Sequence, residues 1–418
     1  MKRFTVATAA LVLTLAGCST GGGDAAGNDS VLTLAAAGSA PAQAVIDAFK
    51  AANPGIEVKT TFTEDDASYQ QQLRTQLASG TAPDVFRIWP GAGNSTSVLD
   101  LSKDGLLADL SGEAWAAKVN EAEKTVSSDA NGKLVALPVT IGAIGAVWND
   151  QAVSKSGLAK PATFPQVLEF CKAARGKNTY AFALGLKSAW VTQLIPYALT
   201  SSLVYGPNPE FTADQLAGKT TFAASAWKDA MDKYVQMKDA QCFNPSPNGV
   251  GYDEQMQMLG QGKALGAVHV LSAVANAKKY ATADTTFSMT PFPATDKAAD
   301  TFVPVSVGIA YAVNAKAKNP ELAKKFLDFV AGDQGQEVYA TKAAAAPALP
   351  TTAFKADALQ QPVLDAQTGG RSTVYPDQRW PGPKVQSEHL IAIQELFNGD
   401  IDVPTVLKRL DEAFAAEK

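Results

Sequence analysis

Residues 31–62 read VLTLAAAGSAPAQAVIDAFKAANPGIEVKTTF, and this stretch decides the fold. Residues 31–35 are apolar apart from Thr33, which is typical of a buried strand. Ser39 can then cap a helix, and Val45, Ile46 and Phe49 recur at the spacing of a helix face. After a turn, apolar and polar residues alternate over 56–62, which predicts a second, half-buried strand.

The same pattern continues along the chain. A second helix is expected up to Gly80 and a third strand over 84–89. Strands that alternate with helices at this spacing are joined by right-handed crossovers, so the sequence predicts a parallel α/β sheet. Further strands are expected over 143–149, 262–268 and 305–313, and helices over 320–330, 390–397 and 403–414.

The first thirty residues have the pattern of an export signal. Lys2 and Arg3 precede an apolar run over 4–16, which is too short to span a bilayer. The sequence Leu-Ala-Gly before Cys18 resembles the lipobox of bacterial lipoproteins. That resemblance implies a signal peptide over 1–17, a lipid on the Cys18 thiol, and a flexible Gly-rich tether over 18–30. An ordinary signal peptide with a chance cysteine is the alternative.

Length and charge limit the classes of function. The 418 residues are too many for one hydrophobic core and fit two domains. The net charge is −5 and becomes more negative once the basic signal is removed. An acidic chain of this kind argues against a nucleic-acid partner.

Three cysteines are present, and two of them remain if Cys18 carries the lipid. In an exported protein an even remainder suggests a disulfide, here between Cys171 and Cys242. Two free buried thiols are an alternative. A catalytic Cys-His pair is a further one, although no local signature surrounds either cysteine.

The sequence contains none of the short motifs that mark common catalytic or cofactor sites. There is no Gly-x-Ser-x-Gly, no His-Glu-x-x-His, no paired Cys-x-x-Cys and no Gly-x-Gly-x-x-Gly. We therefore expect no metal, no cofactor and no enzymatic activity. A membrane-anchored glycoside hydrolase stays open, since its two carboxylates need no sequence motif.

Several segments together resemble the extracellular solute-binding protein family 1, the sugar-binding lipoproteins of ABC importers typified by maltodextrin-binding protein. Each segment is weak alone, but their order and spacing cover nearly the whole mature chain. The segments are 49–58, 77–85, 132–138 with 148–149, 161–164, 260–264 and 323–329. The placement of Cys171 and Cys242 is also similar to that in members whose corresponding helices are cross-linked.

The resemblance implies a class II periplasmic-binding-protein-like fold, with two hinge-linked α/β lobes around a central cleft. The amino-terminal lobe would hold 31–141 and 292–335, and the carboxy-terminal lobe 142–291 and 336–418. The protein would be an exported monomer, anchored by lipid to the outer face of the bacterial cytoplasmic membrane. It would capture a sugar by hinge closure and deliver it to permease subunits.

The residues themselves indicate where a sugar would bind. Hydroxyl groups need polar partners, and the apolar faces of sugar rings lie on aromatic side chains. Such groups belong at strand ends and in the loops that follow. The candidates at these places are Trp89, Glu64, Asp65, Trp190, His269, Ser306, Gly308, Arg371, Asp377, Arg379 and Trp380.

Trp89→Ala and Trp380→Ala are therefore expected to weaken sugar binding without unfolding the protein. Histidine at 269 departs from the family, which usually has a Trp-containing turn there. Arg371 and Arg379 could bind an acidic ligand or form surface ion pairs. A binder of polyamine, iron or phosphate and an exported adhesion or sensory lipoprotein are the alternatives for the function.

Overall fold

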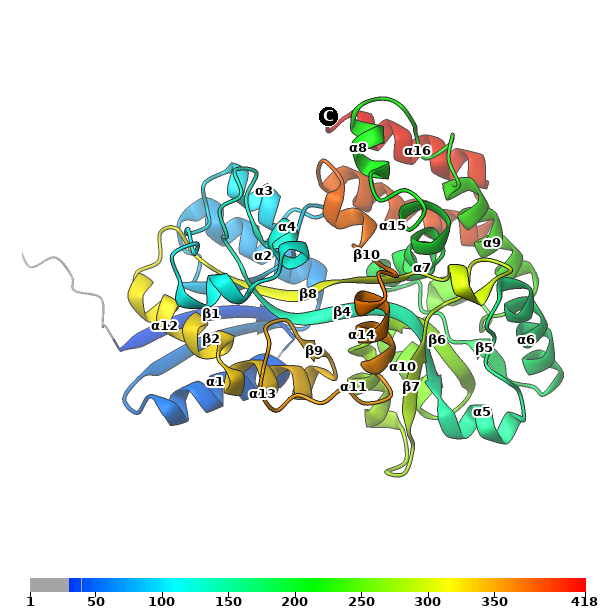
Figure 1. Cartoon of the computed structure of the whole chain (residues 1–418), viewed down its shortest axis with the longest axis horizontal. Helices are drawn as coiled ribbons and strands as arrows, with labels where there is room; N and C mark the ends of the chain where they lie inside the picture. Colours follow the sequence, from blue (N-terminus) through cyan, green and yellow to red (C-terminus); the bar gives the residue numbers. More distant parts are fainter. Residues whose placement is uncertain (1–29, 39) are drawn as a thin grey trace, which may run out of the picture.

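A computed structural model describes residues 30–38 and 40–418. The expected signal peptide, Cys18, most of the tether and the capping residue Ser39 lie outside the described residues. Figure 1 shows two lobes side by side, with two long strands running from one to the other.

One curled mixed sheet passes through both lobes in the order β2-β1-β3-β8-β4-β6-β5. The described strands are β1 (Val31–Ala37), β2 (Glu57–Thr63), β3 (Val85–Ile88), β4 (Leu137–Asn149), β5 (Tyr180–Phe182), β6 (Ala264–Val270), β7 (Phe287–Thr290), β8 (Val303–Val313), β9 (Ala346–Pro347) and β10 (Ser372–Thr373). Strand β1 pairs in parallel with β2 and β3, which confirms the parallel arrangement predicted from the first ninety residues.

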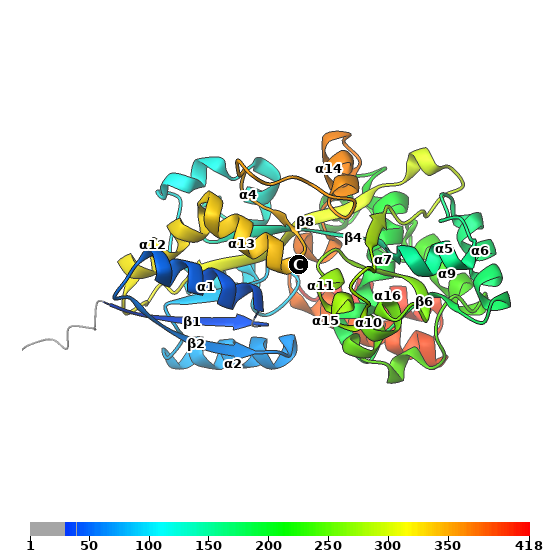
Figure 2. The same ribbon diagram turned by 90° about the horizontal axis from the view of Figure 1, so that it is seen from below.

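The first lobe has helices on both faces of its sheet (Figure 2). These helices are α1 (Ala40–Ala52), α2 (Asp66–Ser79), α3 (Val98–Lys103), α4 (Glu121–Ser127), α12 (Pro320–Ala331) and α13 (Asp333–Ala343). Alternation along β1 explains the two layers. Leu32 and Leu34 belong to the core formed with α1 and α12, whereas Ala35 and Ala37 belong to the core formed with α2 and α3.

The second lobe is larger and contains the disulfide. Its helices are α5 (Asp150–Ser156), α6 (Phe164–Gly176), α7 (Leu194–Thr200), α8 (Phe211–Leu216), α9 (Trp227–Asp239), α10 (Tyr252–Gly260), α11 (Ala273–Ala277), α14 (Gln361–Thr368), α15 (Pro383–Asn398) and α16 (Val403–Ala415). Cys171 of α6 is bonded to Cys242, which follows α9, so the predicted pairing is confirmed. Trp148 and Trp227 are fully buried in the core of this lobe.

Strands β4 and β8 join the lobes. They pair antiparallel, from Leu137 opposite Tyr311 to Ala143 opposite Val305. The first pair has Tyr311 and Leu137 in the first-lobe core, and the second pair lies in a second-lobe core. The sheet is mixed rather than purely parallel because β4 leaves the first lobe and β8 returns to it in the opposite direction.

Two segments pack differently from the division expected at 292 and 335. Phe292 belongs to the second-lobe core with Trp148. Tyr339 of α13 and Leu349 belong to the first-lobe core, together with Phe49 of α1. The core membership of these residues therefore differs from the division that the resemblance implied.

Asp84 ties the first lobe together where β3 begins. Its Oδ2 accepts hydrogen bonds from the amide and the hydroxyl of Thr33 in β1, at 3.0 and 2.6 Å. Its Oδ1 accepts from the amides of Lys318 and Asn319, at 2.7 and 3.2 Å, directly before α12. One buried carboxylate thus holds a strand and a helix start that are more than 200 residues apart.

Candidate functional site

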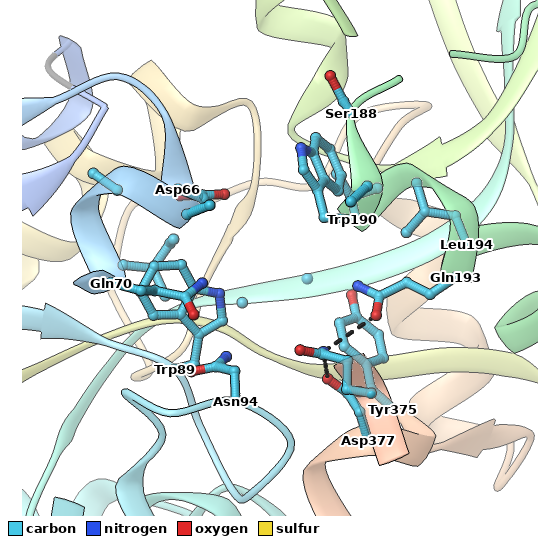
Figure 3. A pocket seen from close by; sticks show the side chains of 18 of the residues that line it. Asp66, Gln70, Trp89, Asn94, Ser188, Trp190, Gln193, Leu194, Tyr375 and Asp377 are labelled. Carbon is cyan, nitrogen blue, oxygen red and sulfur yellow. Dashed lines mark hydrogen bonds between the residues drawn. The ribbon is translucent and has the colours of Figure 1, made fainter. Parts of the chain in front are cut away.

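A cleft of about 1600 Å³ lies between the lobes and is lined by residues of both. In Figure 3, Gln70, Trp89 and Asn94 of the first lobe face Trp190, Gln193, Tyr375 and Asp377 of the second across an open space. The crossing strands contribute its floor through residues such as Thr140, Gly142 and Gly308.

Trp89 forms the aromatic part of the first-lobe wall. It follows β3 directly, and side chains two positions apart along a strand project from the same side, so Arg87 lies beside it. The guanidinium carbon of Arg87 is 4.4 Å from the centre of the Trp89 ring. Arg87 Nη1 is itself held by the carbonyl oxygen of Ala37 at 3.0 Å and by Asp66 Oδ1 at 3.2 Å. The indole is thereby backed by a fixed cation.

Polar groups of the first lobe come from the start of α2 and from the loop after β3. Asp66 and Gln70 are one helical turn apart, so they share the face of α2 that lines the cleft. Asn94 Oδ1 accepts from the amide and hydroxyl of Thr96, at 2.9 and 3.0 Å. The side-chain carbonyl of Asn94 is therefore already hydrogen-bonded to Thr96, whereas its side-chain NH2 group is available to a ligand.

Glu64 and Asp65 both line the cleft margin and are exposed. Asp65 Oδ1 accepts from the amide of Ser68 at 2.8 Å and caps α2. The side-chain and backbone hydrogen bonds of Ser68 lower the pKa of Asp65. One of its two oxygens is thus already used, which the sequence could not show.

Trp190 and Tyr252 form the aromatic part of the second-lobe wall. Trp190 lies in the short helix η2 (Ala189–Gln193), and Tyr252 begins α10. Their ring centres are 5.1 Å apart with an angle of 61° between the planes.

His269 lies behind this pair and not among the residues that line the cleft. Its ring is edge-on to Trp190 at 5.1 Å and stacked on Tyr252 at 5.3 Å. Nδ1 accepts a hydrogen bond from the amide of Val270 at 2.9 Å. Burial lowers the pKa of His269 to about 3, so the imidazole is neutral and supports the two aromatic rings. His269 therefore supports the rings of the cleft wall, whereas the sequence suggested that it would contact the ligand directly.

Asp377 lies in the short helix η7 (Pro376–Arg379), at the cleft wall of the second lobe. Its Oδ2 accepts from Gln386 Nε2 of α15 at 2.6 Å, and the same nitrogen donates to Gln193 Oε1 at 3.2 Å. These two bonds are the dashed lines in Figure 3. Tyr197 and Tyr375 also line this part of the cleft.

Gln378, also of η7, is fastened to the crossing strand β8. Ser306 Oγ donates to Gln378 Oε1, and Gln378 Nε2 donates to the carbonyl oxygen of Val307 at 3.3 Å. On the other side, the amide of Ala92 donates to the carbonyl oxygen of Gln378 at 3.0 Å. Ser306 is therefore a structural anchor of the turn, while its neighbour Gly308 lines the cleft.

Besides His269 and Ser306, three further predicted site residues lie away from the cleft lining. Arg371 borders a smaller cavity of about 580 Å³, and Arg379 is exposed and donates to the carbonyl oxygen of Pro209 at 3.4 Å. Trp380 is 1% exposed and packs against Tyr197, Phe222 and Trp227 in the second-lobe core. Its expected role as a ligand contact is therefore replaced by a structural one, because the Gly- and Pro-rich stretch around it folds inward.

The charges along the cleft are balanced. Six acidic and six basic side chains line it: Glu64, Asp65, Asp66, Asp377, Glu388 and Glu412 against Arg87, Lys187, Lys279, Lys342, Lys384 and Arg409. Two of the basic groups are already paired, Arg87 with Asp66 and Arg409 with Glu388. The formal charges of the lining thus sum to zero.

Sequence reasoning missed several polar and aromatic residues of the lining. They are Gln70, Asn94, Gln193, Tyr197, Tyr252, Asn276 and Gln386. A usable signal existed only for some of them, such as Gln70 one turn after Asp66. The rest are brought to the cleft by packing between segments far apart in the chain.

Within residues 30–38 and 40–418, no three His, Cys, Asp or Glu side chains gather in a way that would hold a metal ion. In the same ranges, no helix combines the length and apolar character needed to cross a membrane.

Comparison with known proteins gives the family and the fold. Residues 33–337 match the family model described as "Bacterial extracellular solute-binding protein". No curated protein matches the chain in a sequence comparison.

Solved structures with the same fold are numerous, and three illustrate the likeness. One comes from work on xylan utilisation by Caldanaerobius polysaccharolyticus (TM-score 0.80, 20% identity, 91% of this chain and 99% of that chain). The solute-binding protein RafE in complex with raffinose has a TM-score of 0.77 at 17% identity, covering 93% of this chain and 99% of that chain. A Bacillus licheniformis sugar transporter with stachyose has a TM-score of 0.73 at 18% identity, covering 93% and 100%.

Proposed function

This chain belongs to the family of bacterial extracellular solute-binding proteins, and from that premise we propose that it captures an uncharged sugar or oligosaccharide for an ABC importer. The observation that carries the proposal is the composition of the cleft. Indole rings stand on both walls, amide and carboxylate groups lie between them, and the charges balance. Rings and hydrogen-bonding groups of this kind fit a neutral polyol.

The proposed contacts come from both lobes. Trp89, Glu64, Asp65 and Asp66 lie on the first-lobe side, and Trp190, Tyr252 and Asp377 on the second. Of the residues proposed from sequence, Gly308 contributes backbone at the floor, while Ser306 and His269 act through neighbouring groups. The solved structures with raffinose and stachyose have the same fold and support this class of ligand.

The proposed mechanism is hinge closure. A ligand that touches both walls favours the closed form because only that form makes both sets of contacts. Strands β4 and β8 are the natural hinge, since they cross between the two cores. We place the lobe boundaries within these strands and after Leu349, where the chain leaves the first-lobe core.

The cellular setting is part of the same proposal. A lipid on Cys18 would hold the monomer on the outer face of the cytoplasmic membrane, and the closed form would deliver its sugar to permease subunits. The protein itself would make and break no covalent bond. The family is one of binding proteins, which supports this non-enzymatic role.

Isothermal titration calorimetry tests the proposal. The panel is galactose, xylo-oligosaccharides, raffinose, stachyose and chitin oligosaccharides, with phosphate, spermidine and a hexuronate as charged comparisons. We expect a neutral sugar to bind and to be recovered unchanged. Binding of a charged solute alone, or hydrolysis of a glycoside during the titration, would reject the proposal.

A further inference from the structure

The second-lobe wall of the cleft contains three buried polar atoms without a hydrogen-bond partner among the described residues. They are Asp377 Oδ1, the hydroxyl of Tyr197 and the hydroxyl of Tyr375. A buried polar group left without a partner costs roughly 1–3 kcal/mol, so such groups are rare in folded proteins. Three of them on one cleft wall indicate a subsite that is completed by a ligand.

The carboxyl group of Asp377 has no cation to balance it. Within residues 30–38 and 40–418, no lysine or arginine forms an ion pair with it, and its Oδ2 accepts a hydrogen bond from Gln386. The titratable groups around it are Tyr197 of α7, Tyr205 of the π-helical turn η3 (Ser201–Tyr205), Tyr375, and the exposed Arg379 of its own turn. His389 of α15 packs on Tyr197 and is neutral, because burial lowers its pKa to about 3.

We propose that Asp377 Oδ1 accepts a hydrogen bond from a hydroxyl group of the sugar, so that the sugar binds the ionised carboxylate and its binding releases one proton to solvent. This inference rests on the proposed function. It adds that one subsite of the cleft offers a charged hydrogen-bond acceptor to a sugar hydroxyl. A sugar hydroxyl donates one hydrogen bond and accepts others, so neighbouring hydroxyls satisfy the carboxylate and the two tyrosines together.

The protonation of the free protein makes this step measurable. Burial raises the pKa of Asp377 to about 7 and outweighs the lowering effect of hydrogen bonding, such as that from Gln386. Near neutral pH the carboxyl is thus about half protonated. In the proposed contact the sugar hydroxyl is the donor and Oδ1 the acceptor, so a carboxyl that carries its proton on Oδ1 cannot form this contact until the proton leaves.

The sign of the pH effect follows. Apparent affinity scales with the competent fraction of the protein. For a group that titrates at about 7, this fraction falls about tenfold between pH 8 and pH 6. The sugar should therefore bind about tenfold more tightly at pH 8 than at pH 6.

The test is calorimetry at pH 6, 7 and 8 with the neutral oligosaccharide that binds most tightly in the panel above. Buffers of different ionisation enthalpy report the number of protons released. The wild-type protein should show the tenfold change and a release that approaches one proton at pH 6. Asp377→Asn, which replaces the carboxylate by a neutral amide that does not titrate, should bind more weakly and with no change over this range.

Glu123 provides a matched control. Burial also raises its pKa to about 7, against hydrogen bonds from Asn120, but it does not line the cleft. Glutamine can keep its place in the capping box of α4, so Glu123→Gln should fold normally. Its affinity should keep the full pH dependence of the wild-type protein.

An affinity that is constant, or that rises toward pH 6, would overturn the inference while leaving the sugar-binding function in place. A pH dependence that persists in Asp377→Asn, or disappears in Glu123→Gln, would overturn it equally. Absence of sugar binding at every pH would instead reject the proposed function.

Discussion

At the scale of single residues, two tryptophans have different roles: we expect Trp190 to bind sugar and Trp380 to stabilise the fold. Trp190 is partly exposed on the cleft wall, whereas Trp380 is enclosed by core aromatics. Trp190→Ala should weaken sugar binding at least tenfold, about 1.4 kcal/mol, because a stacking surface is lost. Trp380→Ala should instead lower the free energy of unfolding by about 3–5 kcal/mol. Calorimetry and urea unfolding of both variants give the comparison, and equal losses of stability would contradict this division.

His269 acts through Trp190 and Tyr252, so ring shape should matter more than its polar atoms. His269→Phe keeps a flat ring and should bind sugar at pH 8 within about threefold of the wild-type protein, whereas His269→Ala should bind about tenfold more weakly. Trp190 fluorescence should shift in the alanine variant alone. If both variants bind as the wild-type protein does, His269 has no positioning role.

The same histidine affects stability in acid. Its pKa is about 3 in the folded protein, below the ordinary value of 6.5. A lowered folded pKa contributes stability above pH 6.5 that is lost as the pH falls toward 3. His269→Phe should therefore lose less stability than the wild-type protein between pH 7 and pH 5, as measured by urea unfolding.

The sequence predicted the candidate site only in part. Trp89 and Trp190 could be proposed because Trp89 directly follows a predicted strand and Trp190 lies in a predicted loop. The prediction that Trp380 contacts the ligand was wrong, because a Gly- and Pro-rich sequence does not show whether its side chains point inward. Asp377 was proposed from the sequence, but the different roles of its two oxygens could not be. Gln386 donates to Oδ2 and leaves Oδ1 without a partner, and only packing brings Gln386 to this place.

At the scale of elements, Asp84 is the main polar link between β1, β3 and α12. Burial would raise the pKa of Asp84, but hydrogen bonds from Thr33 and from the amides of Asn319 and Lys318 outweigh this and lower it. Its stabilising effect is present above about pH 4 and is lost as the pH falls further. Asp84→Asn should lower the free energy of unfolding at pH 7 by about 3 kcal/mol, since three backbone amides and a hydroxyl lose a charged acceptor.

Urea unfolding at pH 7 and pH 3 checks this. The difference between the wild-type protein and Asp84→Asn should shrink in acid. A constant difference over that range would mean that the ionised carboxylate does not carry the effect.

Most elements were predictable because their signals are local. Alternation along β2 and the apolar stripe of α12 need only a short window of sequence. The antiparallel pairing of β4 with β8 joins residues about 170 apart, so no window contains it. The packing of α13 on the first lobe was missed for the same reason, since Tyr339 and Phe49 belong to one core only in the folded chain.

At the scale of the whole molecule, the turn around Gln378 connects the hinge to the first lobe. A Cβ atom at Gly91 would lie 2.3 Å from the carbonyl oxygen of Gln378, so only glycine fits this contact. Gly91→Ala should displace η7 together with Asp377 and weaken sugar binding about tenfold, or 1.4 kcal/mol.

Gly105 is the matched control for this change. Its φ of +65° is close to the +68° of Gly91, but nothing lies within 4 Å of its added Cβ. Gly105→Ala should cost about 1–2 kcal/mol of stability from backbone strain and leave affinity unchanged. Equal affinities for the two variants would show that the contact of Gly91 with Gln378 does not control the cleft.

The central claim is that a two-lobed clamp closes on an uncharged sugar. Small-angle X-ray scattering measures this most directly, with and without the tightest neutral oligosaccharide at a concentration that calorimetry shows to be saturating. We predict a smaller radius of gyration with sugar, and no change for Trp190→Ala at a sugar concentration that leaves that variant unbound. An identical scattering curve for the free and the saturated wild-type protein would contradict the account.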